Sequence, residues 1–303
     1  MNQESKDKQF AAFVSILSNT FLILMKLVAG VISGSISIIS EAIHSMSDLL
    51  ASFLAFFSVR QASIPADSDH QYGHGKFEDF SGFFEGLLIF AAAVFIVYES
   101  VEKIVSRNFH SIEPTIGIVV MGVSFLVNLI ISAYIMKIGE KSDSIALVAD
   151  AEHLRTDVLT SGGVMLGLVL IKFTGFNILD PIIAILVSLM IFRTSISLCR
   201  NAGANLLDSS IKKEDIEAIK DVVSEYIPDR ICELKNIKTR KAGKMKLIDL
   251  TLSVPSDLTI KSGHDICDEI EEHIGNRISN VSVFIHLEPV SYTHLTLPTI
   301  LRV

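Results

Sequence analysis

Two pairs of ionisable side chains with the same spacing interrupt long apolar stretches of this sequence. His44 precedes Asp48 by four residues, and His153 precedes Asp157 by four residues. Residues four apart on a helix lie on one face, so each pair would present an imidazole nitrogen and a carboxylate in the same direction. Two such helices facing each other supply two nitrogen and two oxygen ligands, which suits tetrahedral Zn²⁺. The repeated spacing therefore predicts one four-ligand metal site.

Other acidic residues near these pairs have weaker claims to a function. Glu41 lies on the same helix face as His44 and Asp48, and it fits a supporting role or simple packing equally well. Asp150 and Glu152 lie nearer the expected start of their helix, where carboxylates interact favourably with the helix dipole. We therefore expect this dipole role for Asp150 and Glu152.

A polar segment between two apolar stretches holds a second group of ligand-type side chains. Asp67, His70 and His74 lie within eight residues of one another, so they either surround a second metal ion or belong to a solvated loop. The glycines on both sides of His74 indicate a specific backbone turn.

Six apolar segments are long enough to position these residues inside a membrane. A helix needs roughly 20 mostly apolar residues to cross the ~30 Å hydrocarbon layer. The segments cover about residues 10–31, 36–59, 80–105, 115–138, 145–173 and 181–206. An even number of spans places both chain ends on one side. The larger number of lysines and arginines on that side predicts cytoplasmic termini. We expect a multi-pass protein of the inner (plasma) membrane.

The pattern changes after the sixth apolar segment. An amphipathic helix is predicted over residues 211–227, strands over 231–239 and 245–254, a helix over 260–274 ended by Gly275, and a strand over 281–287. This order predicts a small cytoplasmic α+β domain behind an α-helical membrane domain. We expect the domains to be 1–208 and 209–290. Residues 291–303 resemble a translated cloning sequence and are left out of the fold prediction.

Net charge, cysteine spacing and the residues after His153 argue against several classes of protein. The net charge is −8, with no basic stripe, which argues against nucleic acid as a partner. Cys199, Cys232 and Cys267 are far apart, which argues against a disulfide framework or a thiolate zinc knuckle. His153 is followed by Leu-Arg-Thr-Asp, and no His-Glu-x-x-His occurs, so we do not expect an enzyme.

Three runs of residues resemble the cation diffusion facilitator family, in its bacterial zinc-type form. They are Ser-Glu-Ala-Ile-His-Ser-Met-Ser-Asp-Leu-Leu at 40–50, His-Gln-Tyr-Gly-His-Gly-Lys-Phe-Glu at 70–78 and Ala-Glu-His-Leu-Arg-Thr-Asp-Val at 151–158. The resemblance implies a homodimer in the lipid bilayer, with six membrane helices and a metallochaperone-like cytoplasmic domain in each subunit. It also implies export of divalent metal from the cytoplasm in exchange for protons.

The resemblance also assigns residues to sites. The transport site would be His44, Asp48, His153 and Asp157, and the loop site would be Asp67, His70 and His74. A salt bridge between domains would join Lys76 to Asp208. A cytoplasmic site would use His264, His286 and Glu288. Lys235 and Thr251 stand where relatives have histidines, and Asp249, on the same strand face as Thr251, is a substitute ligand.

Zn²⁺ is the ion that we expect, both as cargo and as a regulatory ion, with transport by alternating access. One alternative is the same fold with Fe²⁺, Mn²⁺, Cd²⁺ or Co²⁺ as the main cargo, because affinity order alone does not decide between these ions. Other classes are an intramembrane metalloenzyme and a metal sensor without transport. The ligand pairs in two separate spans argue against the sensor.

Overall fold

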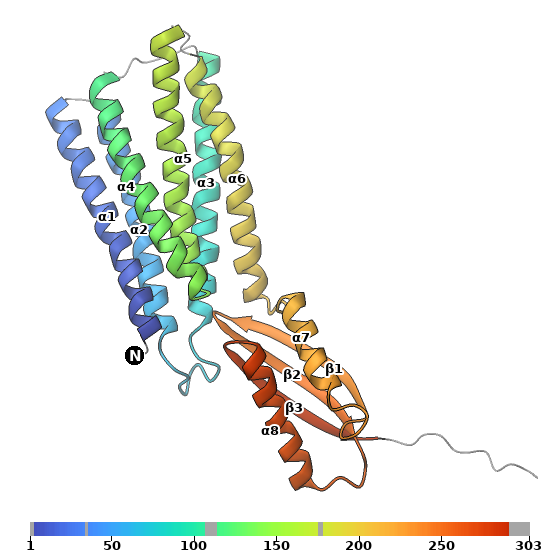
Figure 1. Ribbon diagram of the computed structural model, residues 1–303. Coiled ribbons are helices and arrows are strands. Elements are labelled where there is room, and N and C mark those ends of the chain that lie inside the picture. Colours follow the sequence, from blue (N-terminus) through green and yellow to red (C-terminus); the bar gives the residue numbers. More distant parts are fainter. Residues whose placement is uncertain (1–2, 34–35, 107–113, 175–177, 291–303) are drawn as a thin grey trace, which may run out of the picture. The chain divides into compact units, whose positions relative to one another are not determined.

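Six long helices form the first of two compact units of the chain. The computed structural model describes residues 3–33, 36–106, 114–174 and 178–290, and it divides into residues 1–207 and 208–303. The helices are α1 (Gln3–Ser33), α2 (Ile36–Ala62), α3 (Lys76–Ser106), α4 (Pro114–Lys141), α5 (Ile145–Thr174) and α6 (Leu179–Leu206). They lie side by side as a bundle (Figure 1). The six predicted spans are therefore six helices.

Four of these helices are individually long and apolar enough to cross a membrane, judged on the described residues alone. They are Ser5–Ala29 of α1, Lys76–Ser106 of α3, Ile118–Lys141 of α4 and Pro181–Leu206 of α6. The two remaining helices, α2 and α5, carry the predicted ligand pairs. Helix α5 packs along α4, α3 and α6, and α2 packs along α1 and α3. The apolar helices thus pack against the two helices that carry the predicted ligand pairs.

Close contact between α3 and α6 depends on a glycine. A Cβ atom on Gly86 would lie 2.7 Å from Cys199 Sγ and 3.1 Å from the Cys199 backbone nitrogen. The 2.7 Å distance is shorter than real Cβ contacts and the 3.1 Å distance is unusually tight, so α6 approaches α3 closely where the side chain is missing. An apolar cluster joins α1, α2, α4 and α5. Its buried members are Ala11, Ala12, Val59, Ile135, Met136, Ala146, Leu147, Ala151 and Leu154.

A buried ion pair joins α1 to α3 near the start of both helices. Lys8 Nζ lies 2.6 Å from Glu78 Oε1, and the two side chains are 6% and 4% exposed. The Ser144 hydroxyl, between α4 and α5, donates to the other oxygen of Glu78. These polar residues belong to helices that begin earlier than predicted, at Gln3 and Lys76 rather than near residues 10 and 80. Apolar content predicts the membrane span, but a helix continues beyond it where polar side chains find partners.

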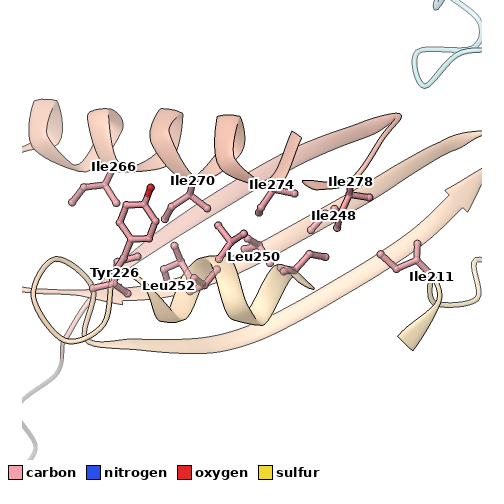
Figure 2. Close-up of a cluster of buried hydrophobic side chains, with 13 residues drawn as sticks. Ile211, Tyr226, Ile248, Leu250, Leu252, Ile266, Ile270, Ile274 and Ile278 are labelled. Carbon is pink, nitrogen blue, oxygen red and sulfur yellow. The ribbon is translucent and has the colours of Figure 1, made fainter. Parts of the chain in front are cut away.

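The second unit is a three-stranded sheet with two helices on one face. Its elements are α7 (Lys213–Ser224), β1 (Glu233–Ala242), β2 (Met245–Val254), α8 (Ile260–Arg277) and β3 (Val281–Pro289). Strand β2 lies in the centre, antiparallel to β1 and parallel to β3. Figure 2 shows Ile248, Leu250 and Leu252 of β2 facing the isoleucines of α8. The predicted α-β-β-α-β order of this domain is confirmed.

One predicted boundary in this domain is wrong. Gly275 does not end α8, which continues to Arg277. Ile274 and Ile278 are both buried, so the apolar face of the helix continues past the glycine. Nothing lies within 4 Å of a Cβ built on Gly275, so packing does not require a glycine here. Its only effect is the greater backbone freedom of glycine. Burial of the isoleucines therefore outweighs the weak helix propensity of glycine.

Candidate metal centre

Three of the four predicted transport ligands converge between α2 and α5. His153 Nε2 lies 3.1 Å from Asp48 Oδ1, and one ligand atom from each of Asp48, His153 and Asp157 lies within 4.8 Å of the others. Asp48 and His153 are 6% and 7% exposed. The backbone of His44 belongs to α2, but its side chain lies outside the described residues, as does that of Glu41. The role of His44 as a ligand stays a prediction.

Polar side chains of α1 and α2 form hydrogen bonds around Asp48. Asn19 of α1 donates from Nδ2 to Ser52 Oγ at 2.8 Å and to the backbone oxygen of Asp48 at 3.4 Å. The Ser52 hydroxyl in turn donates to Asp150 Oδ1 at 3.0 Å. A hydrogen-bonded chain therefore connects α1, α2 and α5 directly beside the ligands.

The dipole role expected for Asp150 and Glu152 is wrong. No acidic residue lies in the first turn of α5, and Asp150 is fully buried in the helix bundle. Glu152 lies within hydrogen-bonding distance of Arg155 at 2.9 Å. The sequence indicates distance from the start of a helix but not which neighbouring helix covers the residue. Asp150 therefore belongs to the polar interior beside the ligands.

Glu85 is a further buried carboxyl group near the ligands, and it was not among the predicted site residues. Glu85 of α3 is fully buried, and Ser81 donates to its Oε1 at 2.9 Å. Within the described residues, Glu85 Oε2 and Asp150 Oδ2 have no hydrogen-bond partner. An ionisable side chain inside an apolar span is itself a signal of function, and this rule would have found Glu85.

The predicted loop residues also form a compact cluster, between α2 and α3. Asp67 Oδ2 lies 3.5 Å from His74 Nε2, and Asp67 Oδ1 lies 3.8 Å from His70 Nδ1. The backbone N–H of His70 donates to Asp67 at 2.7 Å, and this hydrogen bond lowers the pKa of the Asp67 carboxyl. Gly73 adopts φ +81°, which agrees with the specific turn indicated by the glycines. Ligand atoms of the three residues lie within 4.8 Å of one another.

The residues of the predicted cytoplasmic site do not lie close together within a single subunit. Asp249, His286 and Glu288 lie on β2 and β3, with His286 Nε2 3.8 Å from Glu288 Oε1. Lys235 donates to Glu288 at 2.8 Å, which lowers the pKa of this carboxyl. His264 lies on α8, 3.5 Å from Asp268. Among the described side chains these four do not form a metal-holding group, and the site stays a prediction.

The predicted salt bridge between Lys76 and Asp208 would join the two units, and it also stays a prediction. Within its own unit, Lys76 Nζ lies 3.5 Å from the backbone oxygen of Leu206. Asp208 Oδ2 lies 3.6 Å from Arg240 in the second unit.

The ligand atoms between α2 and α5 are an imidazole nitrogen and carboxylate oxygens. This donor set binds zinc and also suits iron and manganese, and none of the three residues is a thiolate that would select softer metals. The two carboxylates can offset the charge of one divalent cation. The cluster is therefore suited to bind a divalent ion inside the bundle.

Comparison with known proteins covers nearly the whole described chain. The family model of the cation efflux transmembrane domain matches residues 12–207, and that of the cation efflux protein cytoplasmic domain matches residues 211–290. An uncharacterized transporter of Synechocystis, sll1263, is 36% identical over 88% of this chain and 85% of its own. An uncharacterized transporter of Methanocaldococcus jannaschii, MJ0449, is 32% identical over 91% and 96%. The manganese efflux system protein MneP of Bacillus subtilis is 30% identical over 92% and 95%.

Proposed function

This chain belongs to the cation diffusion facilitator family of metal efflux transporters, and on that premise we propose that it exports Zn²⁺ from the cytoplasm in exchange for protons. The observation that carries the proposal is the convergence of Asp48, His153 and Asp157 between two helices of a membrane bundle. Ionisable groups are costly in a membrane interior and commonly mark an ion path. As a cation efflux transporter the chain is not an enzyme.

The chemistry of the ligands supports proton exchange. An imidazole binds a metal through a nitrogen that carries no proton, so metal binding releases protons from the site. His153 Nε2 faces Asp48 Oδ1 at 3.1 Å, so a proton held between these two atoms occupies the place that a metal ion needs. Metal and proton therefore exclude each other. Opening the site alternately to the two sides of the membrane then couples their movements in opposite directions.

The second candidate is the same transport reaction with Mn²⁺ as cargo. Two observations favour it: the similarity to a relative named as a manganese efflux protein, and the two carboxylates among the three described ligands. Carboxylate oxygens are ligands that manganese prefers, whereas zinc favours a larger share of nitrogen.

The arrangement of the protein in the cell is part of the proposal. We place it in the inner (plasma) membrane. Both termini would lie in the cytoplasm, the orientation that the distribution of positive charge favours. We assign homodimer formation to the tail domain, whose family model is the cytoplasmic domain of cation efflux proteins. Asp67, His70 and His74 would hold a second ion, and a regulatory ion would bind Asp249, His264, His286 and Glu288.

Metal flux in liposomes tests the proposal. The purified chain is reconstituted, and uptake of Zn²⁺ and Mn²⁺ is followed with and without a pH gradient, for the wild type, Asp157→Ala and the control Asp221→Ala. Asp221 is exposed on α7 of the tail domain. We expect Asp157→Ala to abolish flux and the control to retain it. Wild-type flux in Asp157→Ala contradicts the site, and flux that does not respond to the gradient contradicts proton exchange.

A further inference from the structure

A small cavity lies against both aspartates of the transport site. Its volume is ≈ 20 Å³, and Asp48, Asp157, Asn19 and Asn128 are among its described lining residues. A cavity of roughly this volume holds one water-sized particle. Lys26 also lines the cavity and donates to Ser45 Oγ at 2.7 Å, so a positive charge is already present there.

The two asparagines of the cavity differ in their hydrogen bonds. Asn19 uses its amide to connect α1 with Ser52 and with the backbone of Asp48. Asn128, in the middle of the apolar helix α4, is 4% exposed, and its Oδ1 has no hydrogen-bond partner among the described residues. A buried acceptor without a partner is unfavourable, and in native proteins such an atom commonly faces a water or an ion. Asn19 therefore has a structural role, whereas the oxygen of Asn128 is available for a ligand.

We infer that Asn128 Oδ1 is a further ligand of the transported ion, contributed by α4 in addition to the ligands of α2 and α5. This inference rests on the proposed function, since it concerns the same ion. An amide oxygen is a neutral, hard donor of the kind that binds Mn²⁺ and similar cations. Zinc is commonly satisfied by four ligands, whereas manganese favours six and mostly oxygen. Asn128 therefore contributes more to binding of Mn²⁺ than of Zn²⁺ and widens the range of cargo.

Metal binding by the full-length chain in detergent tests the inference. Zn²⁺ and Mn²⁺ are titrated into the wild type, Asn128→Leu, Asn128→Asp and the control Ser132→Ala. Ser132 is buried one turn further along α4, and its hydroxyl donates to the backbone oxygen of Leu129 at 3.2 Å. Loss of one supporting polar group at a metal site typically weakens binding roughly tenfold or more. We expect that loss for Mn²⁺ in Asn128→Leu, a clearly smaller loss for Zn²⁺, and wild-type binding in Ser132→Ala.

The aspartate variant separates a ligand from a structural amide. Asn128→Asp retains an oxygen donor, so it should bind Mn²⁺ at least as well as the wild type. Unchanged Mn²⁺ binding in Asn128→Leu, equal losses for both ions, or a loss in Asn128→Asp as large as that in Asn128→Leu would overturn the inference. Failure of the proposed function gives a different result: Asp157→Ala then binds both ions like the wild type, and the inference fails with it.

Discussion

Replacing Lys8 with methionine should destabilise the membrane unit by leaving Glu78 as an unpaired buried charge. Both side chains are almost fully buried, and the Nζ–Oε1 distance is 2.6 Å. Removing one partner of a buried ion pair costs about 3–5 kcal/mol, because the other charge remains out of water without compensation. For a unit of about 200 residues, each kcal/mol lowers the melting temperature by about 2–4 °C, so the expected decrease is about 6–20 °C. Methionine keeps the length of the lysine stem, so the loss reports charge rather than packing.

A second variant tests whether the unpaired charge is the cause. In the double variant Lys8→Met, Glu78→Gln, no charge remains, and the amide oxygen can still accept from the Ser144 hydroxyl. We expect this double variant to regain most of the lost stability, because replacing both partners of a buried pair is often nearly neutral. Lys6→Met, at an exposed position of α1, is the matched control.

Unfolding cannot be followed by tryptophan fluorescence, because the chain contains no tryptophan. The detergent-solubilised protein, fused to a fluorescent protein, is heated, and the fraction that remains monodisperse is followed by size-exclusion chromatography. Two results would refute the reasoning: a Lys8→Met midpoint equal to that of Lys6→Met, or a double variant as unstable as Lys8→Met alone.

Two further predictions concern the loop and the tail domain. Gly73→Ala places a Cβ on a backbone of φ +81°, which costs about 1–2 kcal/mol. The loop should therefore bind metal less well, and mass spectrometry should show less metal per chain. Gly275→Ala is the control, because its added Cβ meets open space, and it should not change the metal content. The hydrogen bond from Arg230 lowers the pKa of Glu269 below its ordinary value of 4.5, so the stabilisation by this pair is present above pH 4.5 and is lost as the pH falls through the lowered pKa. Glu269→Gln should therefore weaken hydrogen-exchange protection of α8 at pH 7 but not at strongly acidic pH, after correction for the intrinsic effect of pH on exchange. A difference of equal size at both pH values contradicts this prediction.

The sequence predicted those features that depend on spacing and periodicity. Four-residue spacing places His153 and Asp157 on one helix face, and the structure brings both close to Asp48. The order of helices and strands in the tail domain was predicted from the chain as well, including the amphipathic helix expected over residues 211–227. These signals are local, so they do not require knowledge of which elements are neighbours in space.

Features that depend on contacts between distant segments were not predictable. Lys8 and Glu78 are 70 residues apart, and neither sequence position indicates the other. Asp150 was misjudged because its burial depends on the helices around it. Asn128 is a single amide in an apolar helix, with no repeat that would attract attention, and only the cavity beside Asp48 gives it significance.

The position of ionisable residues on α5 also has a consequence for how the protein enters the membrane during synthesis. Five ionisable residues lie within one stretch of this helix: Asp150, Glu152, His153, Arg155 and Asp157. A charged residue at the centre of a lone helix opposes insertion by about 2.5–3.5 kcal/mol on translocon scales, and one nearer the end opposes it less. The apolar helix α4 ends at Lys141, only a short turn before α5 begins at Ile145, and the two helices pack along each other. Insertion of α4 and α5 together as a helical hairpin would cover these residues, so the side chains that bind cargo also make α5 dependent on its neighbour for entry into the bilayer.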